Sequence, residues 1–341
     1  MKNQKTKLLA LLLVFFMYNC KDKDEAFPEK PSTEITDKLE AVAVAPITVD
    51  APVAVASTNA SVESSAELTG LQADLAALSS GAIPASVTAA NTAVTSALSS
   101  TEISALSSVS AETIQAAFQT GVVSADIKAI IAKAKANPAL AAYLTKFVFP
   151  TVSGVEVKGL RVGGTGDIDK AAKINVSDAC IVASEAAFQA VKVKLDASKI
   201  TETAKVTTAY NGWIAGITTS TATCTTSVAP TYAAYRTGAQ NQAIAFLASL
   251  DAAQTTLGAL YPTIKGLVYL SLLDYLSSVT ELEAADSQKC TVYATALTTA
   301  ANTAQTANLA KVDVNYKAAL AEANALKLEA IESCHNQGGG N

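Results

Sequence analysis

After Ser177 the chain is dominated by the apolar spacing of long helices, and this feature limits the possible folds most. Residues 178–197 place apolar side chains at steps of seven, three and four, and residues 206–217 continue at steps of four, three and four. Such spacing marks the seam along which one helix packs on another. The seam residues are Ile181, Phe188, Val191, Leu195, Val206, Tyr210, Trp213 and Ile217. We predict an all-α fold, an elongated antiparallel helical bundle of long hairpins with coiled-coil packing.

The predicted bundle covers residues 177–335. Its first hairpin turns near 198–201, and its last turns near 308–311, where no Gly or Pro marks the turn. Between them, residues 230–258 and 262–279 predict two more helices, with Pro262 suited to a first helical turn. Whether 263–309 forms one helix or two stays open. Alanine supplies 68 of the 341 residues, which lets helices approach closely.

Four cysteines add a separate constraint on this bundle. Cys180 and Cys224 are 44 residues apart, and so are Cys290 and Cys334. Because the two ends of an antiparallel hairpin are neighbours, we predict the disulfides Cys180–Cys224 and Cys290–Cys334, although four cysteines allow three connectivities. A metal site at Cys334 and His335 is the weaker interpretation, since the chain has no second histidine and no Cys-x-x-Cys pair.

The region before the bundle predicts shorter elements. Residues 62–149 form a short-helix region, in which Ser110 begins a helix that Gly121 ends and Ser124 begins the next. A further helix is expected from Pro138 to about Phe147. Residues 150–176 form an extended connector, with a small β-hairpin or extended loop near 151–166, because valines there alternate with glycines. Residues 336–341 form a flexible tail.

The N-terminus has the pattern of a secretory signal. Lys2, Lys5 and Lys7 precede the apolar run Leu8–Tyr18, which at eleven residues is too short to span a bilayer. We predict that residues 1–19 form a signal peptide that is removed on export. Residues 20–61 contain four prolines after position 27 and suggest a flexible tether.

Cys20 and the residues around it narrow the destination. Cys20 follows Phe16-Met17-Tyr18-Asn19 and precedes the cluster Lys21-Asp22-Lys23-Asp24-Glu25. This arrangement resembles bacterial lipoproteins of the Bacteroidota that are exported to the cell surface, with Asn19 departing from the usual small residue. The resemblance implies lipidation at Cys20 and an outer-membrane anchor facing the cell exterior. An ordinary cleaved secretory signal is the alternative.

Charge and motif content argue against several functions. Removal of residues 1–19 leaves 22 basic and 30 acidic residues, a net charge of −8, which disfavours nucleic-acid partners. The only histidine, His335, lies beside the tail, so no catalytic residue is assigned. Gly159 and Gly164 lack the Lys-Ser/Thr of a phosphate-binding loop, and the calcium-like start at Asp167 lacks its later ligands. No metal or cofactor is expected.

Aromatic residues offer the one candidate ligand site. Tyr210, Trp213, Tyr232, Tyr235 and Arg236 could form a platform for a sugar or peptide, although at helical spacing such residues more often fill a seam. We predict a non-enzymatic surface-anchored lipoprotein that serves as a structural spacer or protein-interaction module. The alternative is a ligand- or peptide-binding lipoprotein, which an enclosed apolar cavity lined by Tyr or Trp would favour.

Overall fold

The computed structural model describes residues 30–78, 82–157 and 179–335, and these form two compact units. Unit 1 contains the described residues up to Asp50, with 179–209 and 305–335. Unit 2 contains the described residues from Ala51 to Val157, with 210–304. The predicted signal peptide, Cys20, the segment 158–176 and the tail lie outside the described residues.

Two long antiparallel helices confirm the predicted all-α fold. They are α9 (Ala179–Ala252) and α11 (Tyr261–His335), joined by α10 (Gln254–Leu257) and the short 3-10 turn η1 (Gly258–Leu260). The chain reverses at this turn, where Gly258 has a φ of 49° that favours glycine. Pro262 lies in the first turn of α11 as expected.

The predicted turns at 198–201 and 308–311 are wrong. Both segments stay helical, because neither contains a residue that stops a helix, and the Thr201 hydroxyl donates to the Ala197 carbonyl within α9. The predicted helix start at Pro230 is wrong as well, since α9 continues through this proline. Residues 263–309, which the sequence leaves open as one helix or two, all lie within the single helix α11.

The disulfides consequently join the long helices to each other. Cys180 pairs with Cys334 and Cys224 with Cys290, so the predicted pairs Cys180–Cys224 and Cys290–Cys334 are wrong. The position of the turn at Leu257 explains which cysteines pair. Cys180 and Cys334 each lie 77 residues from it, and Cys224 and Cys290 each lie 33 residues from it. Two half-cystines at equal distances from a reversal face each other across an antiparallel pair.

Unit 1 joins its parts of α9 and α11 to the short helix α2 (Thr33–Ala41) and to the extended segment 42–50, which we call the strap. Its core holds Leu39, Val42 and Val44 against Phe188, Val191, Leu195, Ala319 and Ala323. Side chains from both long helices bind the strap backbone, as when Asn308 bonds the N–H and the carbonyl of Asp50 at 3.0 and 2.9 Å. The flexible tether predicted for 20–61 is therefore wrong over residues 30–50.

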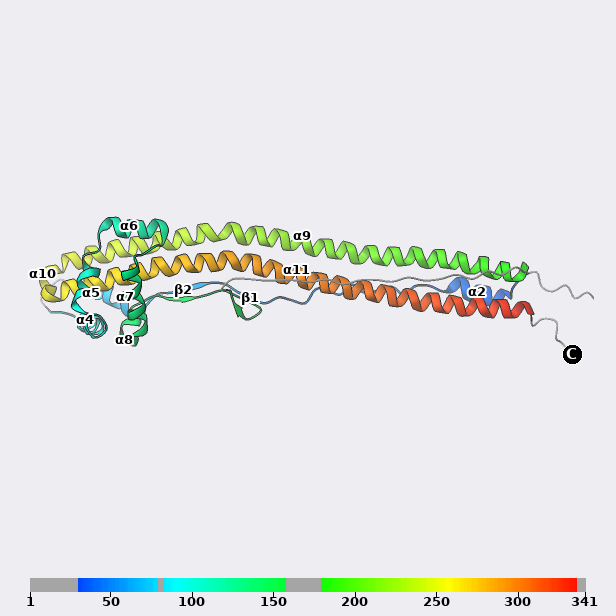
Figure 1. Ribbon diagram of the computed structural model, residues 1–341, viewed down its shortest axis with the longest axis horizontal. Coiled ribbons are helices and arrows are strands. Elements are labelled where there is room, and N and C mark those ends of the chain that lie inside the picture. Colours follow the sequence, from blue (N-terminus) through cyan, green and yellow to red (C-terminus); the bar gives the residue numbers. More distant parts are fainter. Residues whose placement is uncertain (1–29, 79–81, 158–178, 336–341) are drawn as a thin grey trace, which may run out of the picture. The chain divides into compact units, whose positions relative to one another are not determined.

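Unit 2 packs short helices on the part of α9 and α11 that leads into the turn (Figure 1). They are α3 (Ala66–Ala76), α4 (Ala85–Ala97), α5 (Ser100–Ser107), α6 (Ala111–Thr120), α7 (Ala125–Ala136) and α8 (Pro138–Ala141). The predicted caps are confirmed, since the Ser110 and Ser124 hydroxyls accept backbone N–H groups and Gly121 ends α6 in the left-handed conformation. Leu106, Leu140, Leu250, Leu267 and Leu273 are fully buried in the shared core.

Short strands complete unit 2 and correct two predictions. In one sheet, β4 (Thr151–Val152) pairs with β1 (Ser57–Thr58) and with β5 (Val155–Glu156). In the other, β2 (Ser61–Glu63) pairs with β3 (Lys146–Val148). The hairpin expected near 151–166 is thus confirmed over 151–156. Residues 57–61 are in or beside strands rather than in a tether, and the helix from Pro138 ends at Ala141, because the run Lys146–Phe149 favours strand.

An ion pair between half-exposed Lys135 and buried Asp274 ties α7 to α11 in unit 2. The Lys135 ammonium lies 2.6 Å from Asp274, whose side chain is 1% exposed, and Ser278 also contacts both groups. Burial raises the pKa of the Asp274 carboxyl, and the neighbouring Lys135 only partly opposes this effect. The helical span Gln254–Cys334 contains a segment long and apolar enough to cross a membrane, and 61% of that segment is buried inside the protein.

The disulfide pairing predicts how much stability the protein loses when one disulfide is removed. Closing loops of 154 and 66 residues should stabilise the fold by roughly 5 and 4 kcal/mol for each disulfide taken singly, from the entropy of loop closure. We expect Cys224→Ser with Cys290→Ser to lower the free energy of unfolding by about 4 kcal/mol in urea denaturation. Peptide mapping of the unreduced protein should yield a Cys180–Cys334 fragment and a Cys224–Cys290 fragment. A fragment joining Cys180 to Cys224 would contradict the register.

Candidate binding groove

The five residues predicted as an aromatic platform do not form a single site. Tyr210 hydrogen-bonds Asn302 on α11 at 2.8 Å, and Trp213 is half-buried on α9. Tyr232 is 1% exposed and meets Tyr235 edge-on, with ring centroids 5.5 Å apart. Arg236 turns instead to Glu283. Tyr232 therefore fills the seam, and burial raises the pKa of its hydroxyl far above the usual range.

A groove in unit 2 lies between α6 and the two long helices. Its volume is about 670 Å³, and it opens to solvent. Its apolar lining comes from all three helices, and its polar lining is rich in amides. The lining includes Ile114, Gln115, Phe118, Gln119, Arg236, Gln240, Ile244, Leu247 and Tyr269. We call this feature the α6 groove.

The end of α6 sets the position of this helix against α11. Gly121 has a φ of 67°, and its Cα packs directly on Thr280, so that an added Cβ would collide with the Thr280 hydroxyl. Thr280 is itself oriented by donating to the Leu276 carbonyl at 3.0 Å. Glycine is thus required here both for the left-handed backbone and for the close approach.

Arg236 supplies the charge in the α6 groove. Its guanidinium donates to Glu283 at 2.5 Å and to Thr280 at 3.2 Å. The Arg236 and Glu283 side chains are only 21% and 26% exposed. The two opposite charges cancel within this ion pair, so the pair gives the groove lining no net charge. Burial also raises the pKa of Tyr269, which stays a neutral hydroxyl.

The chemistry of the α6 groove suits a polypeptide. Gln115, Gln119 and Gln240 each carry an amide that both donates and accepts hydrogen bonds, as a peptide backbone requires. Ile244 lies on the α9 side and is 59% exposed, which leaves apolar surface available for a side chain. Sequence reasoning missed this site, because Ile114 and Phe118 have the spacing of ordinary core residues.

A second cavity in unit 2 is smaller. Its volume is about 270 Å³, and Phe246, Val268 and Leu272 contribute apolar walls. Tyr235 and Tyr275 also line it, and burial raises the pKa of the Tyr275 hydroxyl. This cavity opens to solvent too, so neither space is the enclosed pocket that would favour a small ligand.

The part of the chain that the structure describes contains no candidate metal centre. No group of three or more His, Cys, Asp or Glu side chains gathers there to hold a metal ion. Comparison with protein-family models, with curated proteins and with solved structures finds no match. The α6 groove is therefore the candidate site on the basis of its geometry alone.

The Gly121 contact generates a prediction for the groove. Gly121→Ala should lower the free energy of unfolding by about 2 kcal/mol or more, since the left-handed backbone alone costs alanine about 1–2 kcal/mol and the collision adds to it. Gly212→Ala is the matched control: Gly212 lies within α9 with nothing near its Cβ position, and alanine there should stabilise by about 0.5–1 kcal/mol. Urea denaturation measures both, and equal effects would contradict the close packing of α6.

Proposed function

We propose that the protein is a non-enzymatic, surface-anchored lipoprotein whose unit 2 acts as a protein-interaction module. The open α6 groove is the observation that carries this proposal. Its amides and the exposed Ile244 match an extended segment of a partner protein better than a small molecule, which is usually held in a more enclosed pocket. Unit 1 is assigned the role of the structural spacer.

The placement of Lys30 supports an anchor next to unit 1. Only residues 21–29 separate Cys20 from Lys30, and ten peptide steps reach at most about 36 Å. Two residues after Lys30, the Ser32 N–H donates to the Ser333 hydroxyl near the end of α11 at 3.3 Å. The strap then continues along both long helices. Because the reach from Cys20 to Lys30 is short, a lipid at Cys20 would hold unit 1 close to the membrane.

A ligand-binding lipoprotein is the second candidate. The smaller cavity favours it, since Tyr235 and Tyr275 offer ring surface beside the hydroxyls and amide of Ser65, Thr145 and Gln242. A sugar could stack there. The cavity volume of about 270 Å³ lies just below the usual size of small-molecule pockets, which places this candidate second.

Lipidation and surface exposure give one test. In a bacterium that surface-exports lipoproteins, the wild-type protein should incorporate labelled palmitate and be digested by protease added to intact cells. Cys20→Ala should abolish the label, because the acylated thiol is lost. Cys224→Ser controls for the loss of a cysteine and should keep the label. Labelling of the Cys20→Ala variant would contradict lipidation at Cys20, and protection of the wild type from protease would contradict surface exposure.

Site-specific photo-crosslinking tests the α6 groove. A benzophenone amino acid at position 244 should give a discrete protein adduct on the cells that make this protein, since Ile244 lines the groove. The same probe at position 200 is the control, because Ile200 is also on α9 and is 70% exposed, but lies in unit 1. Adducts of equal yield at both positions, or at neither, would contradict a partner in the groove.

A further inference from the structure

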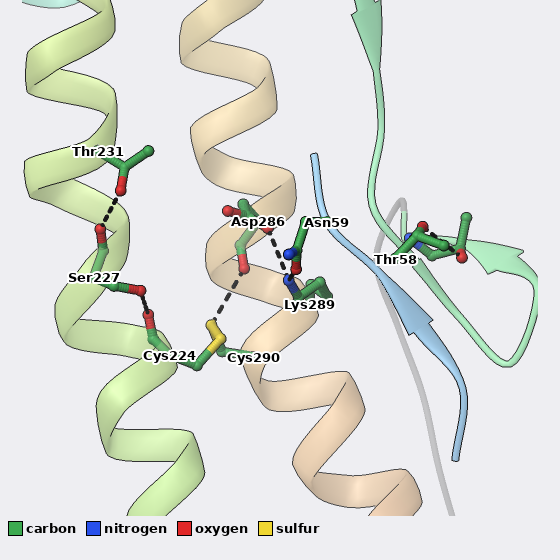
Figure 2. A network of polar contacts seen from close by, with 9 residues as sticks. Thr58, Asn59, Cys224, Ser227, Thr231, Asp286, Lys289 and Cys290 are labelled. Carbon is green, nitrogen blue, oxygen red and sulfur yellow. Dashed lines mark hydrogen bonds and ion pairs between the residues drawn. A yellow bond between two sulfur atoms is a disulfide. The ribbon is translucent and has the colours of Figure 1, made fainter. Parts of the chain in front are cut away.

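A buried lysine in unit 2 faces an asparagine side chain. Lys289 on α11 is 7% exposed, and its Nζ donates to Asn59 Oδ1 at 2.7 Å (Figure 2). The amide carbon Cγ is bonded to that oxygen at about 1.23 Å, so Nζ lies no more than about 3.9 Å from Cγ. Reacting atoms in near-attack arrangements lie about 3–3.5 Å apart. The hydrogen bond therefore already holds the amine within about 1 Å of that range, and rotation of the amide would present its face to Nζ.

The backbone on both sides of Asn59 is held in place. Thr58 pairs with Thr151 in one sheet, where their hydroxyls lie 2.9 Å apart, and Ser61 pairs with Val148 in the other. Ala60 packs against the apolar cluster that includes Cys290, the residue after Lys289. The lysine side is fixed by the Cys224–Cys290 disulfide, which joins α9 to α11 at this point (Figure 2). Both reactants therefore sit on restrained elements.

Asp286 provides a proton acceptor next to the amine. Its Oδ1 lies 3.3 Å from Lys289 Nζ, one helical turn earlier on α11. The same oxygen is buried and has no well-aligned hydrogen bond. Burial raises the pKa of the Tyr232 hydroxyl on α9, and the nearby Asp286 carboxylate adds to this effect. A carboxylate with a free acceptor site beside a buried amine is poised to remove a proton from it.

We propose that Lys289 and Asn59 form an intramolecular isopeptide bond, with Asp286 as the catalytic residue that moves the protons. The Lys289 amine attacks Asn59 Cγ, the Nζ–Cγ bond forms, and the Cγ–Nδ2 bond breaks. Two protons of the Lys289 ammonium pass through Asp286 to Nδ2, which leaves as ammonium. Charge and atoms balance, Asp286 is regenerated, and neither oxidant nor cofactor is needed. Asn59 is exposed, so the leaving group has a path to solvent.

The bond would join two parts of unit 2 that no disulfide connects. Residues 51–157 contain no cysteine, so apart from the backbone itself the strands and short helices are held on α9 and α11 by non-covalent contacts. The proposal is independent of the function assigned to the α6 groove.

Mass spectrometry of the full mature protein tests this proposal. After reduction of the disulfides, the wild-type chain should weigh less than its sequence by the mass of one ammonia. A tryptic digest should contain a branched peptide joining the segment around Asn59 to the segment around Lys289, with cleavage after Lys289 lost. An unmodified mass and two separate peptides in the folded, aged protein would overturn the proposal.

Variants separate this reaction from other losses of ammonia. Asn59→Ala, Lys289→Arg and Asp286→Asn should each restore the full mass and remove the branched peptide. Asn308→Ala alters another asparagine in contact with a neighbouring segment and should retain the branch. Succinimide formation at Asn59 also releases ammonia but leaves Lys289 free. Loss of ammonia without the branch, or persisting in Lys289→Arg, would therefore overturn the proposal. Circular dichroism checks that each variant folds.

Discussion

The register between α9 and α11 is the constraint on which the rest of the structure depends. Each disulfide joins residues equidistant from Leu257, so both long helices must run without insertion or deletion between the half-cystines and the turn. Alanines such as Ala301 and Ala323 are completely buried along the pair. Small side chains there allow close approach of the helices, and the disulfides prevent sliding by a turn.

The two units stabilise this common pair of helices in different ways. Unit 2 uses large apolar side chains, with Leu267, Leu270 and Leu273 fully buried beneath the short helices. Unit 1 has a smaller core and holds its strap through polar groups, among them Glu202, which accepts the Ile47 N–H, and Lys311, which pairs with Asp50. The extended strap has backbone N–H and C=O groups that need hydrogen-bond partners, and Glu202 and Asn308 supply them at Ile47 and Asp50.

Local signals in the sequence predicted local structure well. The apolar seams, the caps at Ser110 and Ser124, and the stop at Gly121 all have short-range physical causes, and all appear in the structure. Long-range pairing was harder, because cysteines spaced 44 apart fit two closed hairpins and one antiparallel pair equally well. The absence of a Gly or Pro near 308–311 favoured the second arrangement. The glycine at 258, followed by Pro262, marked the true reversal.

Other features arise only from tertiary packing. Val42 and Val44 lie in a segment with the composition of a tether, yet they are buried because α9 and α11 offer an apolar surface beside them. The aromatic platform failed for the opposite reason: Tyr210 and Tyr232 belong to different stretches of one unbroken helix. The α6 groove could not be predicted, since it depends on how far α6 stands from α9.

The positions of the cysteines determine which fragment a single proteolytic cut would release. Both disulfides lie within the α9–α11 pair, and residues 30–157 reach that pair through the backbone of segment 158–178. Cleavage of that segment would split the chain into an N-terminal piece bearing Cys20 and a cystine-linked hairpin. Release of the hairpin from the N-terminal piece would then require only dissociation of non-covalent contacts, and the proposed amide between Asn59 and Lys289 would prevent it.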